Sequence, residues 1–84
     1  MNNWKVYIIQ TKSGKLYTGI TTNLKRRFKE HQNKRIGARY FRFSDPESII
    51  YCESYSNRSA ATKREIAIKK MRRKQKMCLI HDGA

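Results

Sequence analysis

Arg27 and His31 are the residues whose types and spacing first indicate chemistry. They lie one helical turn apart and form a stripe beside the apolar pair Leu24 and Phe28. An arginine beside an apolar seam can hold a phosphate through two hydrogen bonds in a partly desolvated site. A histidine one turn later can orient that phosphate or donate a proton. The alternative is a solvated basic helix face with a structural histidine.

Tyr7, Tyr17 and Glu65 are the other candidates. Taken singly, each tyrosine is more often a packing residue of a small sheet. Glu65 falls on the edge of the apolar face of a predicted helix, so its side chain should point toward the edge of a sheet. The alternative for Glu65 is a helix ion pair with Lys69, worth roughly a few tenths of a kcal/mol. The spacing of the candidates relative to one another favours a functional site over separate structural roles. The residues that share this spacing are Tyr7, Tyr17, Gly19, Arg27 and Glu65.

A β-hairpin must position the two tyrosines. Residues 5–10 and 16–20 are rich in β-branched and aromatic side chains, and Thr11-Lys12-Ser13-Gly14-Lys15 separates them. The pattern predicts a three-residue loop with Gly14 in the left-handed conformation. In that register, positions that sum to 26 lie opposite each other, so Tyr7 and Tyr17 share one face of the hairpin.

Helices must position the other candidates. Residues 24–32 form a predicted helix capped by Thr22 or Asn23, and a second long helix follows a cap at Ser56 or Asn57. The second helix should face a sheet with Ala60, Ala61, Ala67, Ile68 and Met71. A last helical segment over residues 74–80 should add Met77, Leu79 and Ile80 to the core.

The segment between these helices supplies a loop and a strand. Residues 33–39 are predicted to be a basic loop, Asp45-Pro46 a turn, and residues 48–53 a third strand. Three predicted strands and the helices that flank them indicate a domain that mixes α-helices and β-strands. Within the broad α/β class it is expected to be of the α+β type.

Length and charge limit the function further. Eighty-four residues fit a single domain over 1–84, and with 38 % hydrophobic residues its core must be thin. Twenty Lys and Arg against six Asp and Glu give a net charge of +14, which indicates a polyanionic partner, most simply nucleic acid. Cys52 and Cys78 lack zinc-ligand spacing and are interpreted as reduced packing residues. With no leader-like or membrane-spanning apolar run, we expect a soluble cytoplasmic protein.

The ordered motifs resemble the GIY-YIG nuclease family, and within it the small stand-alone YhbQ-like subgroup. The resemblance covers nearly the whole length of the chain. The first motif appears as Lys5-Val6-Tyr7, the second as Tyr17-Thr18-Gly19, and the arginine motif as Asn23-Leu24-Lys25-Arg26-Arg27. The stretches Gly37-Ala38-Arg39-Tyr40 and Arg64-Glu65-Ile66-Ala67-Ile68-Lys69-Lys70 resemble those of the subgroup.

This resemblance implies a small three-stranded antiparallel sheet flanked by helices. It also implies one divalent cation, Mg²⁺ or Mn²⁺, held by Glu65, with Arg27 stabilising charge on the phosphate. Tyr17 would accept a proton from the attacking water, and Tyr7 would position or assist that water. A phenol with a pKa of about 10 is almost wholly protonated at pH 7. We expect Arg27, the cation and the basic field to lower the pKa of Tyr17.

Surface cations would hold the substrate, with DNA favoured over RNA. The candidates are Lys25, Arg26, Lys29, Lys34, Arg35, Arg39, Arg42 and Lys69. We expect no separate DNA-binding domain in 84 residues, so a protein partner or a homodimer could supply specificity, although a monomer is equally compatible. No membrane partner is expected.

Three functions follow from these observations. The first is metal-dependent cleavage of phosphodiester bonds. The second is a nucleic-acid-binding module with weak or no catalysis, because the C-terminus lacks the polar Asn that many family nucleases place near the metal. The third is a subunit whose basic surface docks onto an acidic protein or ribosomal RNA.

Overall fold

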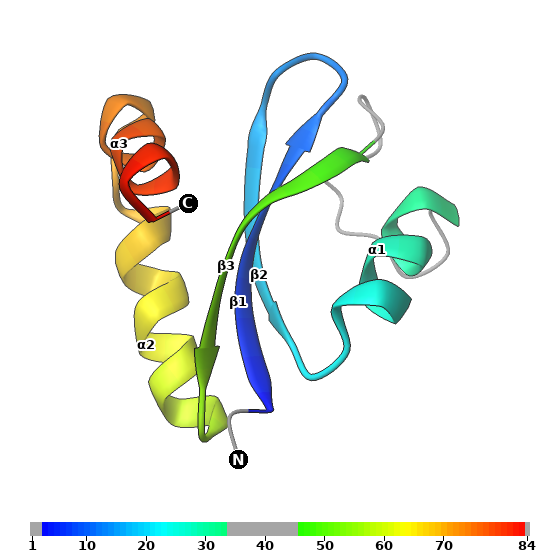
Figure 1. Cartoon of the computed structure of the whole chain (residues 1–84), viewed down its shortest axis with the longest axis vertical. Helices are drawn as coiled ribbons and strands as arrows, with labels where there is room; N and C mark the ends of the chain where they lie inside the picture. The colour runs from blue at the N-terminus through cyan, green and yellow to red at the C-terminus, as the bar shows by residue number, and fades with distance from the viewer. Residues whose placement is uncertain (1–2, 34–45, 84) are drawn as a thin grey trace.

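Three strands and three helices make up residues 3–33 and 46–83, the part of the chain that the computed structural model describes. The elements are β1 (Trp4–Thr11), β2 (Leu16–Thr21), α1 (Leu24–Asn33), β3 (Pro46–Tyr55), α2 (Arg58–Lys69) and α3 (Arg73–Gly83). The strands form one antiparallel sheet in the order β2-β1-β3. The α+β fold class is therefore confirmed, and β1 is the central strand (Figure 1).

The hairpin has the predicted register. Lys5 lies opposite Thr21 and Tyr7 opposite Gly19, so paired positions sum to 26. The loop closes between Thr11 and Lys15, whose backbone groups are joined by a 2.9 Å hydrogen bond, and Gly14 has a φ of 88°. That left-handed conformation favours glycine, which explains why the turn forms at this position.

The third strand is longer than predicted, because it begins at Pro46 and ends at Tyr55. The prediction of a turn at Asp45-Pro46 is wrong for Pro46, which is the first residue of β3, and Asp45 lies outside the described residues. Proline is compatible with this position because β3 is an edge strand and Pro46 is its first residue. A backbone N–H is not needed there for hydrogen bonding between strands. Register shifts interrupt the pairing of β1 with β3 near Ile9 and Thr11.

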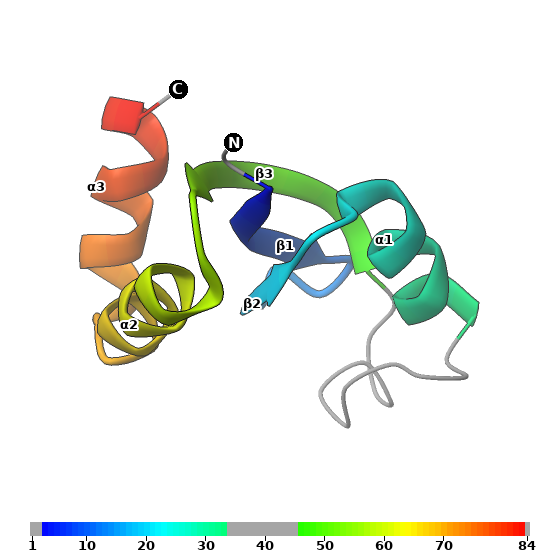
Figure 2. The ribbon, with the colours of Figure 1, turned by 90° about the horizontal axis from the view of Figure 1, so that it is seen from below.

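Helices cover both faces of the sheet, as Figures 1 and 2 show: α1 lies on one face, and α2 and α3 lie on the other. Alternation along β1 sends Val6 and Ile8 into a cluster with Ala61 and Ile68 of α2. Tyr7 and Ile9 point the other way and pack against α1 through the side chains of Leu24 and Phe28. The core is therefore two thin layers.

Some residues predicted to pack are exposed. Ala67 is exposed because α2 meets the sheet through the narrow stripe of Ala61 and Ile68, which are seven residues apart. Cys52 and Cys78 are free, as expected, but both are exposed, so their interpretation as packing residues is wrong. Cys52 lies on an edge strand and Cys78 on the outer side of α3, where neighbouring elements leave them uncovered.

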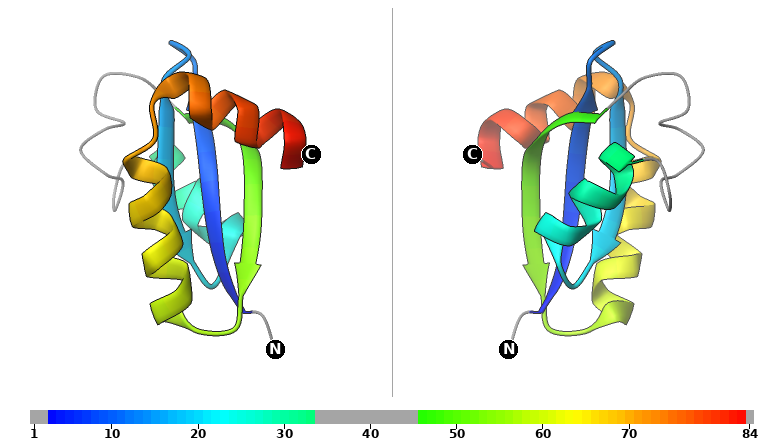
Figure 3. Two further views of the ribbon diagram at one scale, coloured as in Figure 1. Left: turned by 90° about the vertical axis from the view of Figure 1, so that its left-hand side faces the viewer. Right: turned by 90° about the vertical axis from the view of Figure 1, so that its right-hand side faces the viewer.

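The last helix follows the prediction more closely. Leu79 and Ile80 pack against the Val6 cluster, while Met77 is half-buried and lies outside it. Figure 3 shows that α3 crosses over the sheet near the hairpin end and that α2 runs beside β2. In the described part of the chain, no helix is both long enough and apolar enough to cross a membrane.

Glu53 ties α2 to β3. Its carboxylate accepts hydrogen bonds from Arg64 Nε at 2.9 Å and Nη2 at 3.0 Å, from Tyr55 Oη at 2.6 Å, and from Tyr51. Burial raises the pKa of Glu53, but the hydrogen bonds from Arg64 and the two tyrosines outweigh it and hold the pKa below its usual value. Arg64 is the residue next to Glu65, so this network fixes the part of α2 that carries the candidate metal ligand.

Replacing Glu53 by alanine is expected to lower the free energy of unfolding by about 2–4 kcal/mol, because Arg64 and two phenols lose their acceptor. Since the pKa of Glu53 is depressed in the folded state, its stabilisation is complete above the unfolded pKa near 4.5 and is lost as the pH falls through the folded pKa. Thermal unfolding of wild type and Glu53→Ala at pH 7 and pH 3 measures both effects. If wild type and Glu53→Ala differ in stability by the same amount at pH 7 and at pH 3, this role of Glu53 is contradicted. Glu47→Gln, which changes an exposed carboxylate on the same strand, is the control.

Candidate active site

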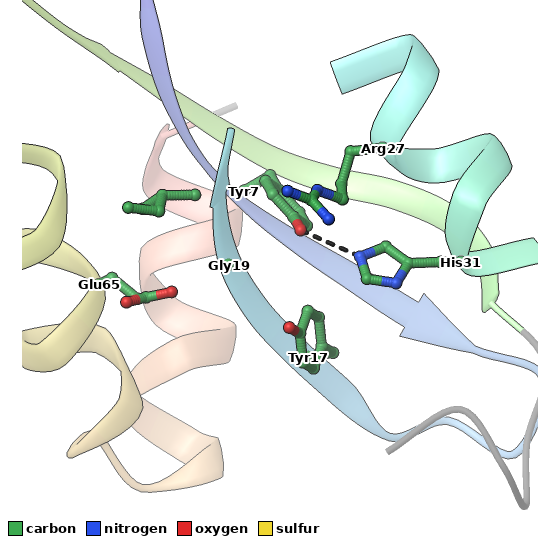
Figure 4. Close-up of a pocket in the computed structure, with 7 residues that line it drawn as sticks. Tyr7, Tyr17, Gly19, Arg27, His31 and Glu65 are labelled. Atoms are coloured by element: carbon green, nitrogen blue, oxygen red, sulfur yellow. Dashed lines mark hydrogen bonds between the residues drawn. The ribbon is translucent and has the colours of Figure 1, made fainter. Parts of the chain in front are cut away.

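The predicted catalytic residues line one open cavity of about 210 Å³ at the outer edge of β2. Figure 4 shows the lining side chains on both sides of this strand: Glu65 approaches from α2 on one side, and Arg27 and His31 from α1 on the other. The lining residues are Tyr7, Tyr17, Gly19, Ile20, Arg27, His31 and Glu65. Residues from β1, β2, α1 and α2 therefore meet at a single point of the fold.

Gly19 gives the two tyrosines their space. It lies opposite Tyr7 in the hairpin, and a Cβ placed on Gly19 would be 2.5 Å from Tyr7 Oη and 3.2 Å from Tyr17 Cε2. The Tyr7 phenol thus lies directly across the glycine and reaches the strand edge. Any larger residue would have to displace this buried ring, which is only 2 % exposed.

Gly19→Ala is expected to lower the rate of any reaction catalysed in this cavity by about 10-fold or more, because it moves the Tyr7 hydroxyl away from its place there. Some loss of stability is expected as well, because the added Cβ would also lie 2.7 Å from Tyr7 Cζ, so the buried ring itself has to shift. Thermal unfolding and single-turnover kinetics on the same preparation separate the two effects. Full activity in Gly19→Ala would show that the close approach of Tyr7 is not required.

Helix α1 presents Arg27 and His31 to the cavity. Asn23 begins the helix, because its Oδ1 accepts a hydrogen bond from the Arg26 amide at 3.0 Å, which selects Asn23 over Thr22 as the cap. Arg27 is 32 % exposed and its Nη1 lies 3.6 Å from Glu30 Oε1. Because this pair is loose, the guanidinium retains donors for an anion.

The other α1 cations face solvent. Lys25, Arg26 and Lys29 are all exposed, as expected for residues on the outer side of the helix. Lys69 of α2 is 51 % exposed. The remaining predicted nucleic-acid contacts, Lys34, Arg35, Arg39 and Arg42, lie outside the described residues.

His31 is buried against the tyrosines. Its Nε2 lies 3.1 Å from Tyr7 Oη, and its ring meets the Tyr17 ring edge-on with centroids 5.4 Å apart. Burial lowers the pKa of His31, and Arg27 lowers it further while Glu30 opposes the change. His31 is therefore mainly neutral at pH 7, and in the tautomer with an unprotonated Nε2 it accepts a hydrogen bond from the Tyr7 hydroxyl.

Both phenols have raised pKa values. Burial raises the pKa of Tyr17, Glu65 raises it further, and Arg27 lowers it by less. Burial also raises the pKa of Tyr7, more strongly, with Tyr17 adding to the effect. The expectation that the surroundings lower the pKa of Tyr17 is therefore wrong for the protein alone, because desolvation and a carboxylate outweigh the nearby arginine.

Glu65 stands across β2 from Arg27, with a side chain that is 18 % exposed. Its Oε2 lies 3.6 Å from Lys69 Nζ, so the predicted helix ion pair is present in addition to the cavity position. In residues 3–33 and 46–83, no group of three or more His, Cys, Asp or Glu gathers into a metal cluster. One carboxylate facing an open cavity still fits a hard cation such as Mg²⁺, which commonly takes one or two protein carboxylates and fills its other positions with water and phosphate oxygens.

Two residues of this region were missed in the sequence. Ile20 lines the cavity because it directly follows Gly19 along the strand edge. Its position next to the second motif could have identified it from the sequence. Glu53 was overlooked as the anchor of α2, although Tyr51, Glu53 and Tyr55 alternate with the period of a strand and so share one face.

Comparison with known proteins shows which family the chain resembles. A family model described as the GIY-YIG catalytic domain matches residues 3–77. The chain is 48 % identical over 77 residues to the UPF0213 protein DP2720 of Desulfotalea psychrophila, covering 92 % of this chain and 70 % of that protein. It is 36 % identical to the UPF0213 protein YhbQ of Escherichia coli K12, covering 100 % of this chain and 83 % of that protein.

Two solved structures are similar to this chain in both sequence and fold. The solution NMR structure of the protein EF2693 from E. faecalis is 37 % identical, with a TM-score of 0.65 over 98 % of this chain and 90 % of that one. The solution NMR structure of the UPF0213 protein BH0048 from Bacillus halodurans is 32 % identical, with a TM-score of 0.60 over 93 % of this chain and 82 % of that one. Three-stranded sheets flanked by helices are thus shared with these relatives.

Proposed function

Because the chain belongs to the GIY-YIG catalytic-domain family, and to the UPF0213 group of small proteins within it, we propose that it is a metal-dependent endonuclease that hydrolyses phosphodiester bonds in DNA or structured nucleic acid. The observation that carries this proposal is the cavity at the edge of β2. It brings together a half-buried guanidinium, two phenols, a neutral imidazole and a carboxylate from four separate elements. This set suits an in-line displacement at phosphorus.

Arg27 binds the scissile phosphate. The guanidinium points into the cavity from α1 and donates two hydrogen bonds to the phosphate oxygens. As negative charge grows on these oxygens, the same hydrogen bonds strengthen. Around the cavity, Lys25, Arg26, Lys29 and Lys69 hold neighbouring phosphates of the strand through their exposed charges.

Tyr17 accepts the proton of the attacking water. It is less buried than Tyr7 and its pKa is raised less, so more of it is phenolate near neutral pH, the form that can accept a proton. Tyr7, fixed by its 3.1 Å contact with His31, orients the water. Glu65 would hold Mg²⁺ or Mn²⁺, and the cation when bound would supply positive charge to the phosphate and the leaving oxygen.

This assignment predicts a rate that rises with pH. The raised pKa of Tyr17 leaves less than about one phenolate in a thousand at pH 7, and this fraction grows about tenfold per pH unit. We therefore expect log kcat to increase with a slope near +1 between about pH 7 and 9, and Tyr17→Phe to remove the slope. If the rate instead levels off at neutral pH in the wild type, the base is the neutral His31 acting through Tyr7.

The second candidate is a nucleic-acid-binding module without useful catalysis. The Glu65–Lys69 ion pair favours it, because this pair gives the carboxylate an ordinary structural role. Under this function Glu65→Ala leaves binding unchanged or tighter, and binding needs no metal. Metal-dependent products that disappear in Glu65→Ala would exclude it.

Cleavage assays on three substrates test the proposed function. Supercoiled plasmid, a branched DNA and a single-stranded RNA are incubated with the wild-type protein in Mg²⁺, Mn²⁺ or EDTA. We expect products from at least one DNA substrate in metal and none in EDTA. An absence of metal-dependent products from all three substrates would remove the nuclease proposal and leave the binding module.

A further inference from the structure

A second cavity, of about 200 Å³, lies between the start of β2 and the start of α3. Its lining consists of Lys15, Leu16, Arg73 and Lys76, so three of its four residues are cations. None of these cations lines the catalytic cavity. We call this second cavity the basic cleft.

No acidic residue lines the basic cleft in the part of the chain that the structure describes. Within residues 3–33 and 46–83, none of its three cations has a carboxylate within ion-pair distance, whereas Arg27, Arg64 and Lys69 each have one. Arg73 is the first residue of α3, whose first turn contains no acidic residue. Like charges gathered around one hollow repel each other and cost stability unless an anion lies between them. The arrangement is therefore suited to binding an anion.

The basic cleft and the catalytic cavity are aligned along β2. Leu16 lines the cleft and Ile20 lines the catalytic cavity, and alternation places both on the α2 side of the strand. Four residues of extended strand separate them by about 13 Å. Figure 3 shows the first turn of α3 beside the hairpin end of β2, which is the end away from α1's cap. A phosphate strand that follows this edge passes both cavities.

From this geometry we infer that the basic cleft binds the phosphate backbone of the nucleic-acid strand cut at the catalytic cavity. With about 3.4 Å of axis per phosphate of one strand, the cleft reaches on the order of four phosphates from the scissile bond. The inference rests on the proposed function, because it takes nucleic acid as the substrate. Such binding at the basic cleft would fix the position of the nucleic-acid strand relative to the catalytic cavity. The described part of the chain has no separate nucleic-acid-binding domain that could do so.

The test compares two variants with the same charge change. Arg73→Gln/Lys76→Gln removes two cations of the cleft, and Lys63→Gln/Lys70→Gln removes two exposed cations of the same helical layer that line neither cavity. Binding of a labelled DNA duplex is measured by fluorescence anisotropy in EDTA over a range of salt concentrations. Thermal unfolding checks both folds, and the charge-preserving Arg73→Lys/Lys76→Arg variant tests for rescue.

We expect the cleft variant to raise Kd by about 10-fold or more, and its slope of log K against log salt to fall by about 0.9 for each phosphate that the variant no longer neutralises. The control variant should change Kd by less than about 3-fold, and the charge-preserving variant should bind like wild type. Equal weakening in cleft and control variants, or an unchanged salt slope, would overturn the inference. The binding assay contains no metal, so it measures binding without cleavage. Loss of binding in the cleft variant therefore supports the inference even if the wild type cuts no substrate. A failure of the wild type to cut any substrate would contradict only the proposed nuclease activity.

Discussion

Arg27→Ala is expected to lower kcat for phosphodiester cleavage by about 10²-fold or more, the loss that follows removal of a preorganised donor to transition-state charge. The guanidinium is held at the cavity wall by α1, and its 3.6 Å contact with Glu30 is loose enough to leave its donors to the phosphate. Arg27→Lys keeps the charge but not the two-pronged hydrogen bond, so its kcat should lie between those of wild type and Arg27→Ala. Steady-state kinetics at saturating metal measure these rates.

Arg26 provides the matched comparison. It carries the same side chain one position earlier but faces solvent. Arg26→Ala should raise KM and leave kcat nearly unchanged, since a surface cation contributes equally to binding substrate and transition state. Similar effects of the two alanine variants on kcat would mean that Arg27 is one more surface cation and has no special place in the reaction.

Glu65→Gln is expected to reduce cleavage by about 10²-fold or more and to weaken binding of Mn²⁺ to the protein. Glutamine keeps the size of the side chain but removes the charge that attracts a divalent cation. Removal of the same charge should not destabilise α2, because the ion pair that Glu65 makes among the described residues is a 3.6 Å contact with the exposed Lys69. Mn²⁺ binding followed by calorimetry is a readout that does not depend on catalysis.

Glu47→Gln is the control for this substitution, because it removes one exposed carboxylate far along the sequence from the cavity residues. It should bind Mn²⁺ and cleave substrate like wild type. If Glu65→Gln binds Mn²⁺ as the wild type does and still loses activity, the carboxylate acts on a proton and not on a metal.

The hairpin could be predicted from the sequence because its register depends on local chemistry alone. Gly14 determines the turn, the turn determines which positions pair, and pairing places Tyr7 beside Gly19 and near Tyr17. The α1 stripe is equally local, since Arg27 and His31 are four residues apart on one helix. Both parts of the site follow from periodicity and capping.

The parts that depend on tertiary contacts could not be predicted in the same way. The anchoring of α2 through Glu53 and Arg64 joins residues 11 positions apart in different elements, and no periodicity within one element reveals it. The pKa of Tyr17 also depends on how much water the folded cavity admits, and burial reversed the expected direction. The exposure of Ala67 results from the narrow stripe, Ala61 and Ile68, through which α2 meets the sheet.

The edge of β2 is the feature that unites the site. Helices on opposite faces of a thin sheet can reach the same point only at an edge, and the absence of a side chain at Gly19 opens that edge to Tyr7. The groups of the proposed site are therefore held by regular elements on both sides of one strand. Such support gives them the restricted geometry that the proposed catalysis requires.

Cleavage of supercoiled plasmid by wild type and Glu65→Gln, purified in parallel and assayed with Mg²⁺ and with EDTA, is the decisive experiment for the proposed mechanism. We predict nicked or linear products from the wild type in Mg²⁺ and from neither protein in EDTA, with Glu65→Gln at about a hundredth of the wild-type rate or less. Equal product formation by the two proteins would contradict the proposal that Glu65 and the cavity around it carry out metal-dependent hydrolysis.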